Sequence, residues 1–326
     1  MYIYQEMKIG GYNCFLGDKG KRIQNQLKLI KLIFESINDI SFKIFETDLI
    51  SQLHDFDAIV TSGDKKVIFP KAVNDQFNFI RSSSIPHLIR DVTYLREIPE
   101  KTGEDVNNFP RFTWNRIVPS NDNFPYDETY DRWSDLSKKY NLSVHDYKTK
   151  GEKILFLLQI PNDASINEMI FSGDNYLDFV IRTLKKIIKL TDRQIILRGH
   201  PLYKIKKITL IPFLLEYFKN TNRLIASINN NLKDDLDQSI CAVSYNSSAS
   251  VEAIIYGINV INLSPYQPCF SAASHNIKDI ENLKNLERED ALKKLSYLHW
   301  SNQELESYEN KKYLCSLIIK SMKNNQ

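Results

Sequence analysis

The segment spanning residues 151–265 constrains the fold most, because strand-like apolar runs alternate there with helix-like runs. Residues 153–159 (KILFLLQ) are almost continuously apolar, which is typical of a strand buried within a parallel sheet. Residues 176–189 repeat apolar side chains at helical spacing and predict an amphipathic helix. Further strands are expected at 194–198, 223–226, 240–244 and 259–263, with helices at 212–218, 232–237 and 248–256. This alternation predicts a mostly parallel sheet built from βαβ units.

The first ninety residues show a weaker form of the same alternation. Helices are expected at 23–35 and 73–81, and strands at 42–45, 57–61 and 85–89. The stretch 97–150 is rich in proline, asparagine, aspartate and aromatic residues, and predicts an irregular connector that also forms part of a cleft wall.

The predicted domains follow from these patterns. We expect an N-terminal Rossmann-like domain over residues 1–145 and a C-terminal Rossmann-like domain over 146–300. A helical segment over 301–326 is expected to pack back on the N-terminal domain.

Composition narrows the class of protein. Hydrophobic residues make up 42% of the 326 residues and charged residues 25%, the balance of a soluble globular chain. A net charge of +3 does not require a polyanionic partner. The four cysteines have no CxxC spacing and indicate free thiols in a reducing compartment. No signal peptide is visible, and no apolar run approaches the ~20 residues of a membrane span. We therefore expect a cytoplasmic protein.

The most specific motif follows the predicted strand at 240–244. Small hydroxyl residues and an asparagine lie between this strand and the next helix, and include Asn246, Ser247 and Ser248. Free N–H groups at a helix start and a compact turn suit a phosphate group, and Glu252 can accept hydrogen bonds from sugar hydroxyls. The alternative is that a serine only caps the helix and Glu252 is a solvated charge.

Two other strand ends are expected at the same edge of the sheet, where open α/β sheets bind ligands. Arg198 and His200 follow the strand at 194–198, and a guanidinium suits bidentate contact with phosphate. Gln159 and Asn162 follow the strand at 153–159 and can hydrogen-bond a ligand. An ordinary loop explains these last two residues equally well.

In the N-terminal half, Asp91 follows the strand at 85–89. A carboxylate there is a candidate general base, kept ionised by the neighbouring Arg90 and Arg96. The alternative is a surface ion pair. The sequence contains no P-loop, no HExxH and no convincing DxD motif, so we expect no metal ligands.

Several segments of the chain resemble a group of phage-encoded glycosyltransferase-like proteins, and more distantly the capsule-polysaccharide sugar transferases. In the N-terminal half, the segments that carry the resemblance are IPHLIRDVTYLR, FTWNRI and YDRW. Further along they are ILFLLQIPNDASI, QIILRGHP, VSYNSSASVEAIIYGINVINL and HWSNQEL. The chain departs from the phage pattern at Gln194, where the group has proline, and at Gly199 before the histidine.

The resemblance implies a GT-B-like α/β fold, with two Rossmann-like domains facing across a cleft. It implies a metal-independent glycosyltransferase, hexosyl or pentosyl, that uses a nucleotide-sugar such as a UDP-sugar as co-substrate and has no other cofactor. Asp91 would be the catalytic base. The donor-binding residues would be Gln159, Asn162, Arg198, His200, Asn246, Ser247, Ser248 and Glu252.

For the acceptor, the resemblance implies hydroxymethylated pyrimidine bases, such as hydroxymethylcytosine, in double-stranded phage DNA within the host cytoplasm. Arg90, Arg96 and Trp114 would bind it. Basic residues in N-terminal loops would hold the DNA backbone, namely Lys19, Lys21, Arg22, Lys65 and Lys66. Two alternatives stay open: a capsule or lipopolysaccharide glycosyltransferase, and a non-catalytic nucleotide- or carbohydrate-binding protein.

Overall fold

The computed structural model describes residues 7–12, 17–35, 40–45, 55–62, 80, 82–83, 85–114, 118, 126–161, 163–166, 169 and 172–324. The chain forms two compact units. Unit 1 comprises Met1–Arg132 and Lys294–Gln326, and unit 2 comprises Trp133–Lys293.

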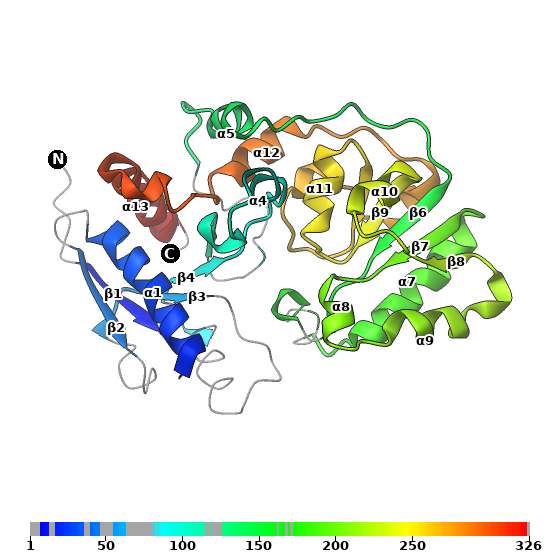
Figure 1. Ribbon diagram of the computed structural model, residues 1–326, viewed down its shortest axis with the longest axis horizontal. Coiled ribbons are helices and arrows are strands. Elements are labelled where there is room, and N and C mark those ends of the chain that lie inside the picture. The colour runs from blue at the N-terminus through cyan, green and yellow to red at the C-terminus, as the bar shows by residue number, and fades with distance from the viewer. Residues whose placement is uncertain are drawn as a thin grey trace. The chain divides into compact units, whose positions relative to one another are not determined.

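Unit 2 contains a five-stranded, wholly parallel sheet in the order β10-β9-β6-β7-β8 (Figure 1). The strands are β6 (Lys153–Leu157), β7 (Gln194–Arg198), β8 (Leu224–Ala226), β9 (Ser239–Ser244) and β10 (Asn259–Asn262). The chain proceeds outward from β6 to β8 and then crosses back to add β9 on the other side of β6. The strand order therefore reverses between β6 and β9, and ligands of open α/β sheets bind at the carboxyl ends of the strands beside such a reversal.

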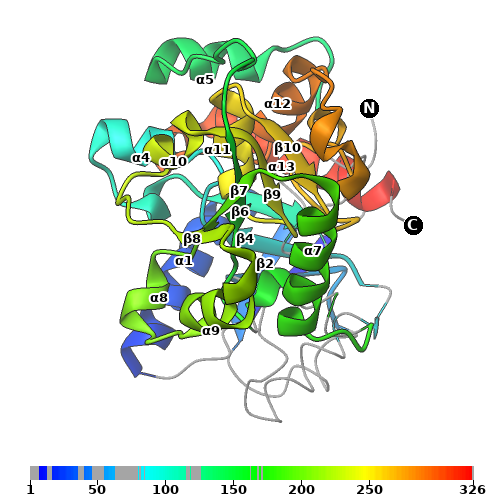
Figure 2. The same ribbon diagram turned by 90° about the vertical axis from the view of Figure 1, so that its right-hand side faces the viewer.

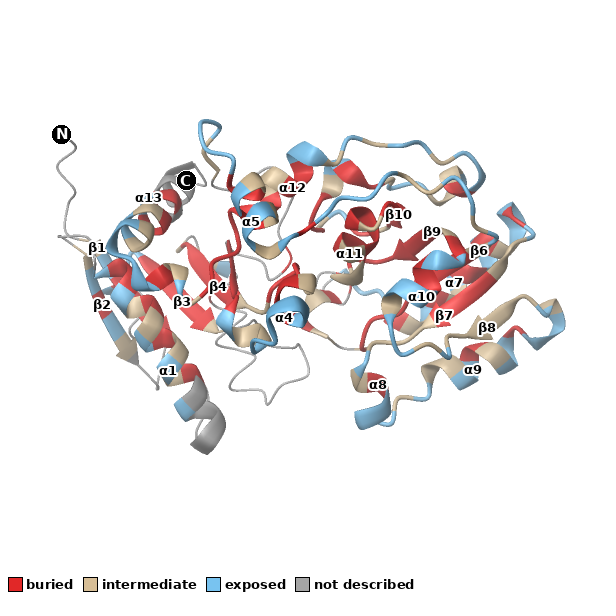
Figure 3. Cartoon of the chain, turned by 45° about the horizontal axis from the view of Figure 1, so that its top comes forward, coloured by how far each residue is buried: buried red, intermediate tan, exposed pale blue. Residues whose placement is uncertain are grey.

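Helices cover both faces of this sheet, α7 and α9 on one face and α10 and α11 on the other (Figures 1 and 2). Their bounds are α7 (Tyr176–Leu190), α8 (Leu202–Ile205), α9 (Leu210–Tyr217), α10 (Leu232–Asp237) and α11 (Ala249–Ile255). The side chain of Asn175 caps α7 by accepting a hydrogen bond from the Leu177 N–H at 2.8 Å. Val180 and Leu184 of α7 pack with Ile154 in the core. In Figure 3 most of β6, β7, β9 and β10 is coloured as buried, whereas the edge strand β8 is intermediate.

Unit 1 contains a second five-stranded sheet in the order β2-β1-β3-β4-β5, parallel except for β5. The strands are β1 (Met7–Tyr12), β2 (Ile40–Phe45), β3 (Ala58–Ser62), β4 (His87–Asp91) and β5 (Arg111–Trp114). Helix α1 (Gly17–Phe34) and helix α13 (Tyr308–Asn324) contribute to one apolar cluster.

The predicted α/β fold with two mostly parallel sheets is confirmed. The stretch 97–150 is less irregular than expected, since α4 (Glu97–Thr102), β5 and α5 (Arg132–Tyr140) lie in it. The boundary between the two units at Arg132 and Trp133 also falls within this stretch. Helix α5 buries Trp133 and Leu136, which helical spacing places on one face. The C-terminal part adds α12 (Glu289–Ser296). The helix expected at 73–81 lies almost wholly outside the described residues.

None of the helices in the described part of the chain is long and apolar enough to cross a membrane.

Candidate functional site

The candidate site lies at the carboxyl ends of β6 and β9, where Gln159 and Asn246 bind one another. The Gln159 Nε2 donates to Asn246 Oδ1 at 2.6 Å, and the Asn246 N–H donates to Gln159 Oε1 at 3.1 Å. Asn246 Nδ2 also donates to the Ser165 carbonyl at 2.7 Å. Both amide side chains are buried. The two amides therefore join the strand ends on either side of the reversal in strand order.

Two tyrosine hydroxyls hold the backbone of Gln159. Its N–H donates to the Tyr176 hydroxyl and its carbonyl accepts from the Tyr203 hydroxyl, each at 2.7 Å. Burial raises the pKa of both tyrosines, so both hydroxyls keep their protons at neutral pH. With Ser165 accepting from its Nε2 at 2.9 Å, Gln159 has partners for its backbone and side-chain amide groups.

A second layer of polar residues lies at the start of α11. Ser244 and Ser250 are buried and both donate to Asn262 Oδ1, at 2.5 Å and 3.0 Å. Ser247, Ser248 and Glu252 are only half-buried. Ser248 makes no side-chain cap of the helix, and the Ser247 hydroxyl accepts from the Ala249 N–H at 3.3 Å. These half-buried groups are more exposed than the serines of β9 and α11 beneath them.

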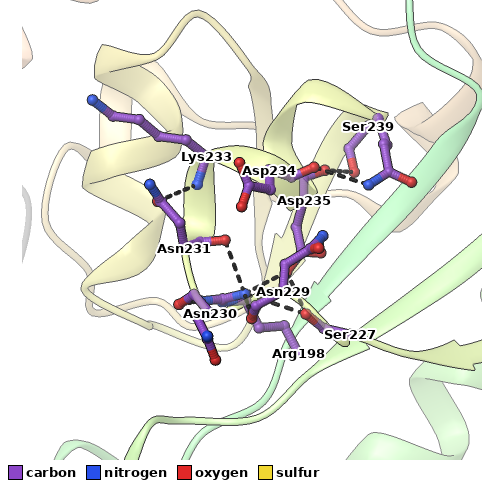
Figure 4. A network of polar contacts seen from close by, with 10 residues as sticks. Arg198, Ser227, Asn229, Asn230, Asn231, Lys233, Asp234, Asp235 and Ser239 are labelled. Atoms are coloured by element: carbon purple, nitrogen blue, oxygen red, sulfur yellow. Dashed lines mark hydrogen bonds and ion pairs between the residues drawn. The ribbon is translucent and has the colours of Figure 1, made fainter.

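Arg198 lies in a different polar network, drawn in Figure 4. Its Nη1 contacts the carboxylate of the buried Asp235 at 2.5 Å and the Ser227 hydroxyl at 3.2 Å. Its guanidinium also donates to three backbone carbonyls of the loop between β8 and α10, those of Asn229, Asn230 and Asn231. Arg198 thus fixes this loop, which would have to release the guanidinium before Arg198 could bind a phosphate.

His200 follows β7 at the same edge and is half-buried. Its Nδ1 accepts from the Leu202 N–H at 3.1 Å, which orients the ring at the start of α8. Because Tyr203 of α8 binds Gln159, the segment after β7 is tied to the end of β6. Asn162 lies outside the described residues.

In unit 1, Asp91 ends β4 and forms an ion pair with Arg111 of the antiparallel neighbour β5. Arg111 Nη2 lies 3.0 Å from Asp91 Oδ2, and the Asp91 side chain is 24% exposed. Arg90 is buried and donates to the Asn107 carbonyl at 2.7 Å. Burial lowers the pKa of Arg90 to about 10, partly offset by the charge of Asp91.

The other predicted acceptor residues lie near these strands. Arg96 directly precedes α4, and its carbonyl accepts from the Glu100 N–H at 3.3 Å. Trp114 ends β5 opposite Leu88 of β4. His299, in the C-terminal part of unit 1, holds the loop after β4, because the Tyr94 N–H donates to His299 Nε2 at 3.0 Å.

Sequence reasoning missed three residues of this site. Tyr176 and Tyr203 hold Gln159 through their hydroxyls, but in sequence they resemble ordinary core aromatics. Asp235 lies in the first turn of α10, where it is buried and forms an ion pair with Arg198. A signal was present, because a lone arginine at the end of a buried strand requires a counterion.

No group of three or more His, Cys, Asp or Glu side chains in the described part of the chain could hold a metal ion.

Comparison with known proteins gives a likeness in structure only. No protein-family model matches the sequence, and no curated protein matches it. The fold is similar to KpsC, beta Kdo 2,7 transferase, from Thermosulfurimonas dismutans, with a TM-score of 0.53, 13% identity, and coverage of 94% of this chain and 99% of that chain. A second KpsC structure from this organism, beta Kdo 2,4 transferase, gives a TM-score of 0.50, 14% identity, and coverage of 90% and 91%. The chain therefore has the GT-B-like α/β fold that the resemblance implies.

Proposed function

We propose that the protein is a GT-B glycosyltransferase that moves a sugar from a nucleotide-sugar to a hydroxyl group of a carbohydrate acceptor. The observation that carries this proposal is the reversal in strand order between β6 and β9, which brings a turn rich in serine and asparagine to the carboxyl edge of the sheet. The likeness in fold to a transferase supports it. A UDP-sugar is the donor we would try first.

The proposed reaction is a substitution at the anomeric carbon of the donor sugar. The acceptor oxygen forms a bond to this carbon, the bond to the diphosphate breaks, and the nucleoside diphosphate leaves with the electron pair. Asp91 takes the proton of the acceptor hydroxyl. The partial positive charge of backbone N–H groups after Asn246 would stabilise the leaving diphosphate without a metal ion.

The hydrogen bonds of unit 2 suggest which of the predicted donor-binding residues contact the nucleotide-sugar and which position the site. Ser247, Ser248, Glu252 and His200 are half-buried, and we assign them contact with the donor. Gln159, Asn246 and Arg198 already bind protein groups, and we assign them the positioning of the turn and of the neighbouring loop.

We favour a carbohydrate acceptor over DNA. The structural neighbours are named as Kdo transferases. Among the basic residues expected to hold DNA, Lys21 on α1 is the one whose side chain is described, and it is exposed. A hydroxymethylated base as acceptor thus stays a prediction from the resemblance, and so do the acceptor roles of Arg90, Arg96 and Trp114.

The first test is a thermal-shift panel on the full chain. It uses UDP-, GDP- and dTDP-linked sugars, and a CMP-linked sugar whose leaving group would be a nucleoside monophosphate. A donor at a hundred times its Kd stabilises the fold by about 2.7 kcal/mol, which corresponds to a rise in Tm of roughly 5–10 °C. We expect Glu252→Ala to reduce this shift. The matched control is Glu152→Ala, since Glu152 is exposed at the opposite end of β6. No shift with any donor, or equal shifts in the two variants, would contradict the proposed donor site.

The second test separates an enzyme from a binding protein. Once the donor is identified, mass spectrometry can measure sugar transfer to a glycan acceptor. Asp91→Asn should abolish this transfer and leave the donor-induced thermal shift intact. Normal transfer by this variant would exclude Asp91 as the base. Donor binding without hydrolysis or transfer in the unmodified protein would favour a non-catalytic role.

A further inference from the structure

Helix α9 is unusually apolar for a helix at the surface of the molecule. Its sequence is LIPFLLEY, and Leu214 is its one fully buried residue. Phe213 and Tyr217 lie one turn apart on the outward face, 44% and 48% exposed, with ring centroids 5.9 Å apart. Surface helices of globular proteins normally place polar residues on this face. The outward face of α9 therefore exposes apolar groups that the described residues of unit 2 leave about half uncovered.

The short helix α8 adds an exposed aliphatic residue within a cluster of lysines. Ile205 is 76% exposed. Lys204, Lys206 and Lys207 surround it in sequence, and all three are exposed. The ion pairs among the described residues involve none of these lysines. We call Lys204, Ile205, Lys206, Lys207, Phe213 and Tyr217 the α8–α9 surface.

The two helices lie side by side, as Figures 1 and 3 both show. A methyl group added to Gly199 would meet Tyr203 of α8 at 2.7 Å and Ile211 of α9 at 3.2 Å. These two residues face inward, so Ile205 and Phe213 lie on the outer side of the same pair of helices.

The net charge of this surface is positive. Glu216, the acidic residue of α9, is paired with Lys219 at 2.6 Å. Lys185 of α7 adds a further cation, with its Nζ 5.3 Å from the centre of the Tyr217 ring. A surface that combines exposed aliphatic and aromatic side chains with unpaired lysines has the chemistry of a segment that lies in a membrane interface. Lysine stems cover apolar surface while their ammonium groups reach phosphate.

We propose that the α8–α9 surface binds the surface of a bilayer containing anionic lipids. Ile205 and Phe213 enter the headgroup region, and the lysines contact lipid phosphates. A second copy of the chain fits less well, because an isologous contact would bring like-charged lysine clusters together. A nucleic acid would use the lysines but leave the aliphatic side chain of Ile205 without a function. The inference is independent of the proposed glycosyl transfer.

The test is co-sedimentation of the full chain with vesicles of phosphatidylcholine, with and without about one third phosphatidylglycerol. We expect binding to the anionic vesicles that weakens with salt, and little binding to phosphatidylcholine alone. A lysine near an anionic surface contributes about fivefold to the partition coefficient. The variant Lys204→Gln/Lys206→Gln/Lys207→Gln should therefore lower partitioning at least tenfold. The variant Ile205→Ser/Phe213→Ser should lower it at unchanged net charge.

The matched control removes three exposed lysines elsewhere in unit 2, as Lys138→Gln/Lys278→Gln/Lys284→Gln. It should partition like the unmodified protein. Three outcomes would overturn the proposal: no binding to anionic vesicles, an equal loss in the control, or unchanged binding of Ile205→Ser/Phe213→Ser. A dimer in sedimentation equilibrium that this last variant dissociates would assign the surface to a second copy instead. Circular dichroism of each variant checks folding. If the double variant unfolds, Ile205→Ser alone repeats the test, because Ile205 is the more exposed of the two residues.

Discussion

Replacing Arg198 by methionine tests whether this residue holds the protein together or holds a ligand. The substitution keeps most of the aliphatic stem and leaves the Asp235 carboxylate, which is 1% exposed, without its cation. Breaking a buried ion pair by removing one partner costs about 3–5 kcal/mol. Asp235 retains the Ser227 hydroxyl at 2.6 Å and Asn229 Nδ2 at 2.7 Å. We therefore expect the lower end, about 3 kcal/mol.

Hydrogen exchange measured by mass spectrometry can follow this loss locally, because the two units of the chain need not unfold together. Peptides from β8, α10 and β9 should lose protection in Arg198→Met. The control is Arg182→Met, whose partner Asp174 lies 3.0 Å away in a pair with both side chains about half exposed. It should change stability by less than about 0.5 kcal/mol. Equal protection in the two variants would refute the assignment of Arg198 to the fold.

The double variant Arg198→Met/Asp235→Leu separates positioning from ligand contact. An apolar pair of similar volume should restore most of the lost stability, because no buried charge remains. If Arg198 only positions the loop, donor binding should recover with the stability. If Arg198 contacts the diphosphate, the double variant should be stable and still bind the donor poorly.

Three further predictions concern other parts of the chain. Burial lowers the pKa of His299 from 6.5 to about 3. Between pH 6.5 and about 3, His299 is therefore protonated in the unfolded chain but not in the folded chain. The free energy of unfolding in urea should fall as pH drops through this window, by up to ~1.4 kcal/mol per pH unit, and His299→Gln should lose less. Gly257→Ala should lower Tm far more than Gly103→Ala: both glycines have positive φ, but a Cβ on Gly257 would lie 2.1 Å from the Asp146 carbonyl oxygen, while one on Gly103 would meet nothing. Burial raises the pKa of three thiols to about 12, so iodoacetamide should label them only in urea, as mass spectrometry would show; they are Cys241, Cys269 and Cys315.

The sequence predicts the buried parallel strands well, because their signal is local. Strands β6 and β7 start where the apolar runs start, since both faces of each strand are covered. Strand β1 was missed because Gly10 and Gly11 interrupt its apolar pattern. Strand β5 was missed because its four residues include Arg111 and Thr113, which are buried by the packing of distant segments such as Tyr94 and His299.

The candidate site shows a different limit of sequence reasoning. A sequence does not distinguish an amide side chain that binds a ligand from one that binds another amide. The burial of the side chain decides between the two. Gln159 and Asn246 are 87 positions apart, and nothing local indicates that each provides the other's hydrogen bonds. The structure divides this edge into a buried layer bound to itself and a half-buried layer that includes Ser248 and Glu252. Substitutions in the buried layer should therefore lower stability and donor affinity together, because an unpaired buried amide costs energy whether or not a ligand is present. Substitutions in the half-buried layer should lower donor affinity more than stability, and this difference identifies the contact residues without a structure of a complex.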